Sequence, residues 1–174
     1  MLIDVSYFTS GPRHILNATT NMTPQQNSVG VNRTIMGYVK HYQMAFLCEM
    51  LGDALALQVN LYMEAKDAAA DTGTQFEPDE GLEQLMAKLR ESFADYVFFY
   101  ILRDASSQAT DRGLVVWKNE NEVVSPISRQ VSVWNEMVNR NIRFKAWAGA
   151  QSSTPYSVAV VSDNMVTRIN TFNL

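Results

Sequence analysis

Apolar residues recur at steps of three and four along residues 82–101, and this is the clearest pattern in the chain. The spacing places them on one side of an α-helix, which we expect to begin near Asp79. Within residues 93–102 the only charged residue is Asp95. A helix that is apolar on nearly every side is buried on most of its surface. The pattern therefore predicts a long helix that packs against more than one neighbour.

Two predicted helices precede it. Apolar residues at helical steps run along residues 32–51, with Asn32 as a candidate N-cap. Gly52 is placed to end this helix, and Asp53 can cap the next one. Residues 68–79 resemble a linker, because they are rich in Ala, Thr and Asp and end in Pro-Asp.

A fourth helix is expected from Ser125 and Pro126, which form a strong helix start, to Gly149. Its apolar positions predict a stripe that faces inward: Ile127, Val131, Trp134, Met137 or Val138, Ile142 and Phe144. On the two longest helices we expect Phe93 and Trp134 each to be buried against the other's helix. The core candidates are Phe93, Tyr96, Tyr100 and Trp134.

Both ends of the chain lie outside this four-helix pattern. Residues 1–30 hold two small apolar clusters between turn residues, which is typical of an extended arm. Residues 150–174 are rich in β-branched residues, and two stretches, 156–161 and 165–172, are predicted strands. The predicted fold is thus mostly α, a small bundle of about four helices over residues 31–149, with an extended N-terminal arm and a β-prone C-terminal tail.

The polar loop 106–125 and the tail supply candidate contacts with other chains. Trp117 is an aromatic residue in a loop with few apolar neighbours, and such residues are frequent interface anchors; packing on the end of its own bundle is the alternative. The tail is expected to add as a strand to a neighbouring chain, or else to fold back as a hairpin on its own bundle. The interface candidates are Leu114, Val115, Val116, Trp117, Tyr156, Val158, Val160, Val166, Ile169 and Phe172.

Composition and charge narrow the class of protein. The chain has 174 residues, 47% of them hydrophobic, and can fill the core of one domain. Its net charge is −4, and no basic run exceeds two residues. This disfavours a protein built to grip nucleic acid. The apolar run at residues 93–102 is too short to span a membrane.

The sequence offers no candidate catalytic, metal-ligating or cofactor-binding residues. His14 and His41 are the only histidines and Cys48 is the only cysteine, and none has the spacing of a metal site. Cys48 is expected to be a buried thiol. Asp95 and Arg103 have no acid–base companion, and we interpret them as ion-pair partners of neighbouring elements. An enzyme is therefore not predicted.

Four stretches, taken in order, resemble the head–tail connector (adaptor) proteins of tailed bacteriophages, especially those of crAss-like and other Bacteroides-infecting phages. They are "VNRTIMGYVKHYQMAFLCEMLGDAL", "FADYVFFYILRD", "GLVVWKNENEVVSP" and "VSVWNEMVNRN". The resemblance covers residues 32–147 and does not extend over the tail.

The resemblance implies a helical bundle without enzymatic activity that assembles in the host cytoplasm into a ring, typically a dodecamer, in the neck of the virion. Such a ring binds the portal protein, extends the DNA channel and docks the next neck or tail ring protein. DNA would pass without sequence-specific binding, and no cofactor or membrane is involved. A negatively charged wall suits this passage, because a basic wall would hold the phosphates.

A different class of function stays open at this point. The chain could be a monomeric or dimeric helical adaptor that binds a peptide or a host protein. The two ends discriminate between these hypotheses, because a monomer has no need of ordered terminal arms, whereas strand addition between chains uses such segments.

Overall fold

The computed structural model describes residues 1–21, 25–105, 107–110, 113–116, 126–151 and 159–172. These residues form a mostly helical fold, as predicted. The α-helices are α1 (Gln26–Leu51), α2 (Asp53–Thr72), α3 (Glu80–Ala105) and α4 (Pro126–Gly149). Shorter elements are the 3₁₀-helices η1 (Val5–Phe8), η2 (Gly11–Arg13) and η4 (Asp163–Val166) and the strands β1 (Ser107–Thr110) and β2 (Gly113–Val116).

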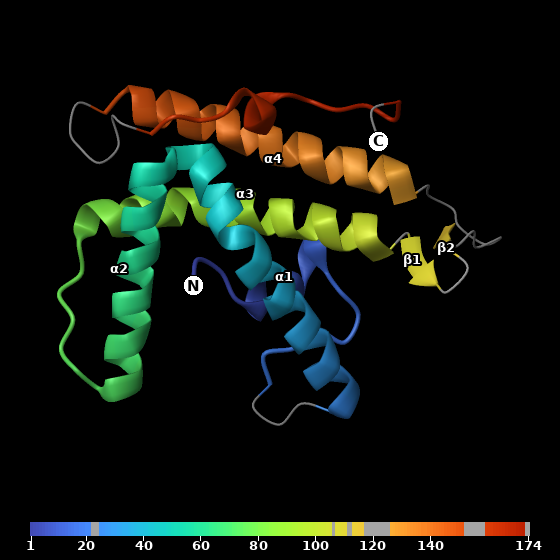
Figure 1. The fold of residues 1–174 in the computed structure, drawn as a ribbon, viewed down its shortest axis with the longest axis horizontal. Helices are drawn as coiled ribbons and strands as arrows, with labels where there is room; N and C mark the ends of the chain where they lie inside the picture. Colours follow the sequence, from blue (N-terminus) through green and yellow to red (C-terminus); the bar gives the residue numbers. More distant parts are fainter. Residues whose placement is uncertain (22–24, 106, 111–112, 117–125, 152–158, 173–174) are drawn as a thin grey trace.

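Helix α3 is the centre of the arrangement (Figure 1). Helix α4 packs along it on one side, and α1 crosses it on the other. Helix α2 packs against the end of α1 and then leads away from the α3–α4 layer. The core therefore lies where α1, α3 and α4 meet, and the far part of α2 projects from it.

Local chemistry explains most helix ends. Gly52, with φ of 75°, separates α1 from α2 in a conformation that favours glycine, and its N–H donates to the Cys48 carbonyl. Asp79 caps α3, because its Oδ1 accepts the Leu82 N–H at 2.9 Å. The linker prediction was wrong for residues 68–72, because the Ala-rich run continues α2 as a helix as far as Thr72.

The start of α1 also differs from the prediction. The helix begins at Gln26, so Asn32 lies inside it. The Asn32 side chain binds the preceding segment instead: its Nδ2 donates to the Thr19 carbonyl at 2.8 Å, and its Oδ1 accepts the Thr19 N–H at 3.2 Å. A side chain with both a donor and an acceptor can tie two segments together, and here that role replaces capping.

The N-terminal segment lies against the body of the molecule and does not project as a free arm. Leu2, Ile3 and Phe8 are buried in the same core as the helices. The Leu2 N–H donates to the buried Oε1 of Gln43 on α1 at 2.8 Å. The first apolar cluster of this segment therefore completes the chain's own core, whereas Leu16 of the second is exposed.

The described part of the tail, residues 159–172, contains no strand, so the prediction of strands fails there. Residues 163–166 form η4, and residues 167–170 run extended beside α4. Side chains of α4 take the backbone groups that a paired strand would use. Asn135 donates to the Ile169 carbonyl and accepts its N–H, both at 3.0 Å.

Within the polar loop, residues 114–116 lie in β2, which pairs antiparallel with β1 in a hairpin beyond the C-terminal end of α3 (Figure 1). Trp117 and half of the first predicted tail strand, residues 156–158, lie outside the described residues.

The inward stripe of α4 is only partly as predicted. Met137, Val138 and Phe144 are buried, but Ile127 and Ile142 are exposed. Buried polar residues replace them: Gln130 donates to the Leu102 carbonyl at 3.2 Å, and Asn141 donates to the Met165 carbonyl at 2.7 Å. The face of α4 that packs inward is thus mixed, which an apolar periodicity cannot reveal.

Candidate functional site

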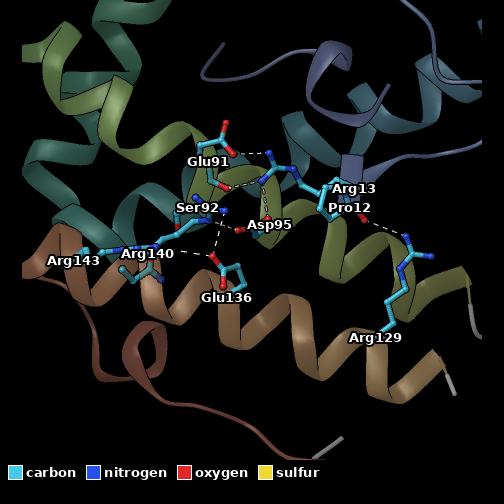
Figure 2. A network of polar contacts seen from close by, with 10 residues as sticks. Pro12, Arg13, Glu91, Ser92, Asp95, Arg129, Glu136, Arg140 and Arg143 are labelled. Carbon is cyan, nitrogen blue, oxygen red and sulfur yellow. Dashed lines mark hydrogen bonds and ion pairs between the residues drawn. The ribbon is translucent and has the colours of Figure 1, made fainter. Parts of the chain in front are cut away.

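The most developed polar site of the described residues centres on Asp95, in the middle of the apolar stretch of α3. Its side chain is nearly buried, and its carboxylate accepts hydrogen bonds from Arg13 of η2 and Arg140 of α4, both at 2.8 Å. Figure 2 shows the two arginines approaching from different elements. The pairing of Asp95 with neighbouring elements, predicted from the sequence, is confirmed. One carboxylate therefore joins three segments of the chain.

Further contacts extend this network (Figure 2). Arg13 also binds Glu91 through Nη2 at 2.5 Å and donates to the Glu91 carbonyl at 3.3 Å. On α4, Glu136 lies 3.4 Å from Arg140 and 4.0 Å from Arg143. Burial raises the pKa of the Asp95 carboxyl, although both guanidinium groups act in the opposite direction. Every named cation here faces a carboxylate, so the network holds segments together and leaves no free acid or base.

A cluster of aromatic rings covers the C-terminal half of α3. Tyr42 of α1 stacks on Tyr100 with ring centres 4.1 Å apart, and Trp134 of α4 packs on Phe99 at 4.8 Å. Phe93, in contrast, packs on Phe46 of α1 at 4.9 Å. Trp134 thus packs on α3 as expected but is only partly buried, whereas Phe93 is fully buried against a ring of α1.

This cluster accounts for the apolar character of α3. Residues 92–99 are all buried, with α1 and the N-terminal segment on one side and α4 on the other. Burial and the hydrogen bond to Asp104 raise the pKa of Tyr38, at the edge of the cluster, to about 12. The tyrosine is thus protonated at neutral pH and acts as a packed hydrogen-bond donor. The apolar helix is covered by its own chain.

A groove of about 390 Å³ lies between α3 and α4, beside the Asp95 network. Lys88 and Arg143 stand on its rim, and the Lys88 ammonium lies 5.5 Å from the centre of the Trp147 ring. The residues that line it are Ala87, Lys88, Glu91, Arg140, Arg143, Phe144 and Trp147. Its guanidinium and ammonium groups are the kind that bind a carboxylate, and the Trp147 ring holds the Lys88 ammonium beside them.

Two other hollows are present. One, of about 720 Å³, lies between the N-terminal segment and α2 and includes Asp67, Asp71 and Arg90. The other, of about 510 Å³, is mainly apolar and lies between Ile15, the start of α1 and Ile101.

Candidate chemistry elsewhere is sparse. Among the described residues there is no group of three potential metal ligands, and no helix is long and apolar enough to cross a membrane. Burial and a hydrogen bond with Asp53 raise the pKa of the Cys48 thiol. The His41 ring packs edge-on against Tyr42 at 4.6 Å.

The predicted interface residues in the described part of the tail differ in exposure. Val160 and Phe172 are exposed, Phe172 by 94%, whereas Val166 and Ile169 are partly buried against the chain itself. Leu114, Val115 and Val116 lie in β2, and Trp117, Tyr156 and Val158 lie outside the described residues. Sequence reasoning missed Arg13, although a carboxylate in an apolar run signals that a cation must come from elsewhere.

Comparisons with protein-family models, with curated proteins and with solved structures gave no match to this chain.

Proposed function

We propose that this protein is a structural virion protein of a tailed bacteriophage, which forms a neck ring between the portal and the tail. The observation that carries the proposal is the order of the four connector-like stretches between residues 31 and 141. Three of them lie in the helices that pack together here, namely α1 with the start of α2, α3, and α4. The motifs thus make up the centre of the bundle.

The proposed role is mechanical. A ring of copies, typically twelve, would extend the DNA channel, with the portal protein on one side and the next neck or tail ring protein on the other. The net charge of −4 supports this role, because phosphates would pass such a wall without being held. No metal, cofactor or catalytic step is part of the proposal.

Exposed apolar side chains favour an assembling protein over an isolated one. Leu57 and Leu61 stand one turn apart on the outer face of α2, and Val160 and Phe172 are exposed in the tail. Scattered exposed apolar residues are ordinary, but a pair on one helix face offers contact area for a neighbouring subunit. We assign Val160 and Phe172, of the tail candidates, to contacts with a neighbouring chain.

The test is to measure the native mass of the full chain and to image it by negative stain, alone and with the portal protein of the phage that encodes it. We expect rings that stack coaxially on the portal. A compact monomer at every concentration, with portal present, would contradict the proposal. A monomer that captures a peptide or a host protein would instead favour the adaptor function.

A further inference from the structure

The end of α2 and the loop that leads from it to α3 are strongly acidic. Residues 64–80 contain six carboxylates and one lysine. Beyond Met63 no residue of α2 is buried, and Figure 1 shows this end of the helix leading away from α3 and α4. We call residues 64–80 the acidic projection. Some of its charges are used within the chain, since Lys66 pairs with Glu83 and Asp67 with the terminal amino group.

Asp71, Glu77 and Glu80 of the projection are exposed, and among the described residues none of the three has an ion-pair partner. A helix end that buries nothing gains little from tertiary packing, which supplies most helical stability in proteins. The projection therefore has both the charge and the exposure of a segment that docks on a basic surface.

The groove between α3 and α4 has the opposite charge. Three cations, Lys88, Arg140 and Arg143, and one carboxylate, Glu91, line it. Lys88 has no carboxylate within ion-pair distance among the described residues. Arg143 is 70% exposed and reaches Glu136 only at 4.0 Å. We call Lys88, Arg140, Arg143, Phe144 and Trp147 the basic groove.

The two surfaces belong to different parts of the same chain. The α2 part of the projection leads away from the layer that contains the groove, and the loop after it returns to the start of α3 (Figure 1). No residue of the projection lines the groove of its own chain. Two different complementary surfaces on one chain give a head-to-tail contact, and repetition of such a contact closes a ring when the rotation allows.

We propose that the acidic projection of one copy docks in the basic groove of the next copy. The contact would be heterologous, with Asp71 and Glu77 facing Lys88 and Arg143. It would be the interface between neighbouring subunits of the proposed neck ring, so this inference rests on the proposed function. Opposite charges across an interface fix the partner and the register, because like charges brought together cost several kcal/mol.

The groove suits an acidic helix better than nucleic acid. Its volume is about 390 Å³, and Glu91 and Glu136 lie beside the arginines. A duplex needs several phosphate contacts spread over a longer basic surface. Here the complementary charge is already present on the same chain.

The experiment uses charge reversal in the full-length protein, followed by sedimentation velocity and native mass spectrometry. The groove variant carries Lys88→Glu and Arg143→Glu; the projection variant carries Asp71→Lys and Glu77→Lys. We expect each alone to raise the concentration needed for assembly at least about tenfold. An equimolar mixture of the two restores assembly, because every contact in an alternating ring then joins opposite charges. The chain with all four changes also assembles.

The matched control reverses two other exposed cations, Arg33→Glu and Lys40→Glu on α1, and should assemble as the unchanged chain does. Circular dichroism verifies that each variant is folded. If the groove variant does not fold, the variant with Lys88→Gln and Arg143→Gln takes its place. Rings that both variants leave intact would overturn the interface and leave the proposed function standing. Failure of the mixture to assemble would also overturn it, and so would binding of a labelled DNA duplex that the groove variant abolishes. A monomeric unchanged chain, with portal present, would contradict both proposals.

Discussion

At the scale of single residues, the decisive feature is a carboxylate placed where the sequence is otherwise apolar. Asp95 is 5% exposed, and two arginines from elements far apart in the chain bind it. A buried ion pair contributes little net stability compared with an apolar substitute, but removal of one partner leaves buried charge unmatched. Asp95 thus specifies how η2, α3 and α4 are placed relative to one another.

We expect Asp95→Asn to lower the free energy of unfolding by about 2 kcal/mol, because a neutral amide cannot satisfy two guanidinium groups. Urea denaturation followed by circular dichroism measures the change. Glu136→Gln, a partly exposed member of the same network, is the control and should cost under about 1 kcal/mol. Equal losses of stability in the two variants would show that Asp95 has no special role in holding η2, α3 and α4 together.

A second prediction concerns pH and Glu83. Burial alone would raise the pKa of this carboxyl, but hydrogen bonds from Lys66 and Tyr62 outweigh it and lower the pKa below its ordinary value. A carboxyl with a lowered folded-state pKa contributes stability above the unfolded-state pKa, and this contribution is lost as pH falls through the folded value.

Glu83→Gln should therefore be less stable than the unchanged chain at pH 7, and the difference should shrink below about pH 4, where the unfolded carboxyl is protonated. Denaturation curves of both proteins at pH 7 and pH 3 test this. A difference that is constant with pH would mean that packing, and not charge, is what Glu83 supplies.

At the scale of elements, the tail behaves as a strap on α4. Trp134 Nε1 donates to the Thr167 carbonyl at 3.0 Å, and Asn135 makes two bonds with Ile169. Val161 and Met165 are buried in the core. Residues whose pattern is typical of a strand thus form an extended segment, and its backbone groups bind side chains of a helix.

Asn135→Ala removes both bonds to Ile169, and we expect it to lower the free energy of unfolding by about 1–2 kcal/mol. Hydrogen exchange should rise at Ile169, while helical circular dichroism stays unchanged. Asn139→Ala is the matched control, because Asn139 only accepts one bond from the exposed Arg168. Unchanged exchange at Ile169 would contradict the strap.

At the scale of the whole molecule, the proposed ring requires surfaces that the bundle leaves free. The segment between α3 and α4 includes the hairpin of β1 and β2 at one end of the molecule (Figure 1). This segment connects α3 to α4, and we propose that it can change without unfolding the bundle.

Replacement of residues 107–122 by a short Gly-Ser linker should leave the helical content and the self-assembly of the bundle intact and abolish stacking on the portal. Circular dichroism, native mass and negative-stain images with portal present measure these three properties. Normal stacking would remove the segment from the proposed contact, and loss of helicity would place it in the core.

The sequence by itself determined the four helices, because the apolar spacing, Gly52, Asp79 and the Ser125-Pro126 start are local signals that act within a few residues. It also indicated that Asp95 must have cationic partners. It could not determine which cations, because Arg13 and Arg140 lie 82 and 45 residues away along the chain, and no local pattern encodes that meeting.

Only the tertiary structure decided where the two ends of the chain lie. The tail has β-branched residues, yet the groups near it are the amide side chains of α4. Asn135 and Asn141 bind backbone carbonyls of the tail, and residues 163–166 form η4. Phe8 enters the core because the helices leave a space that its ring fills. Backbone and apolar groups are satisfied by whichever partners the fold brings near, and that choice depends on the positions of all the elements at once.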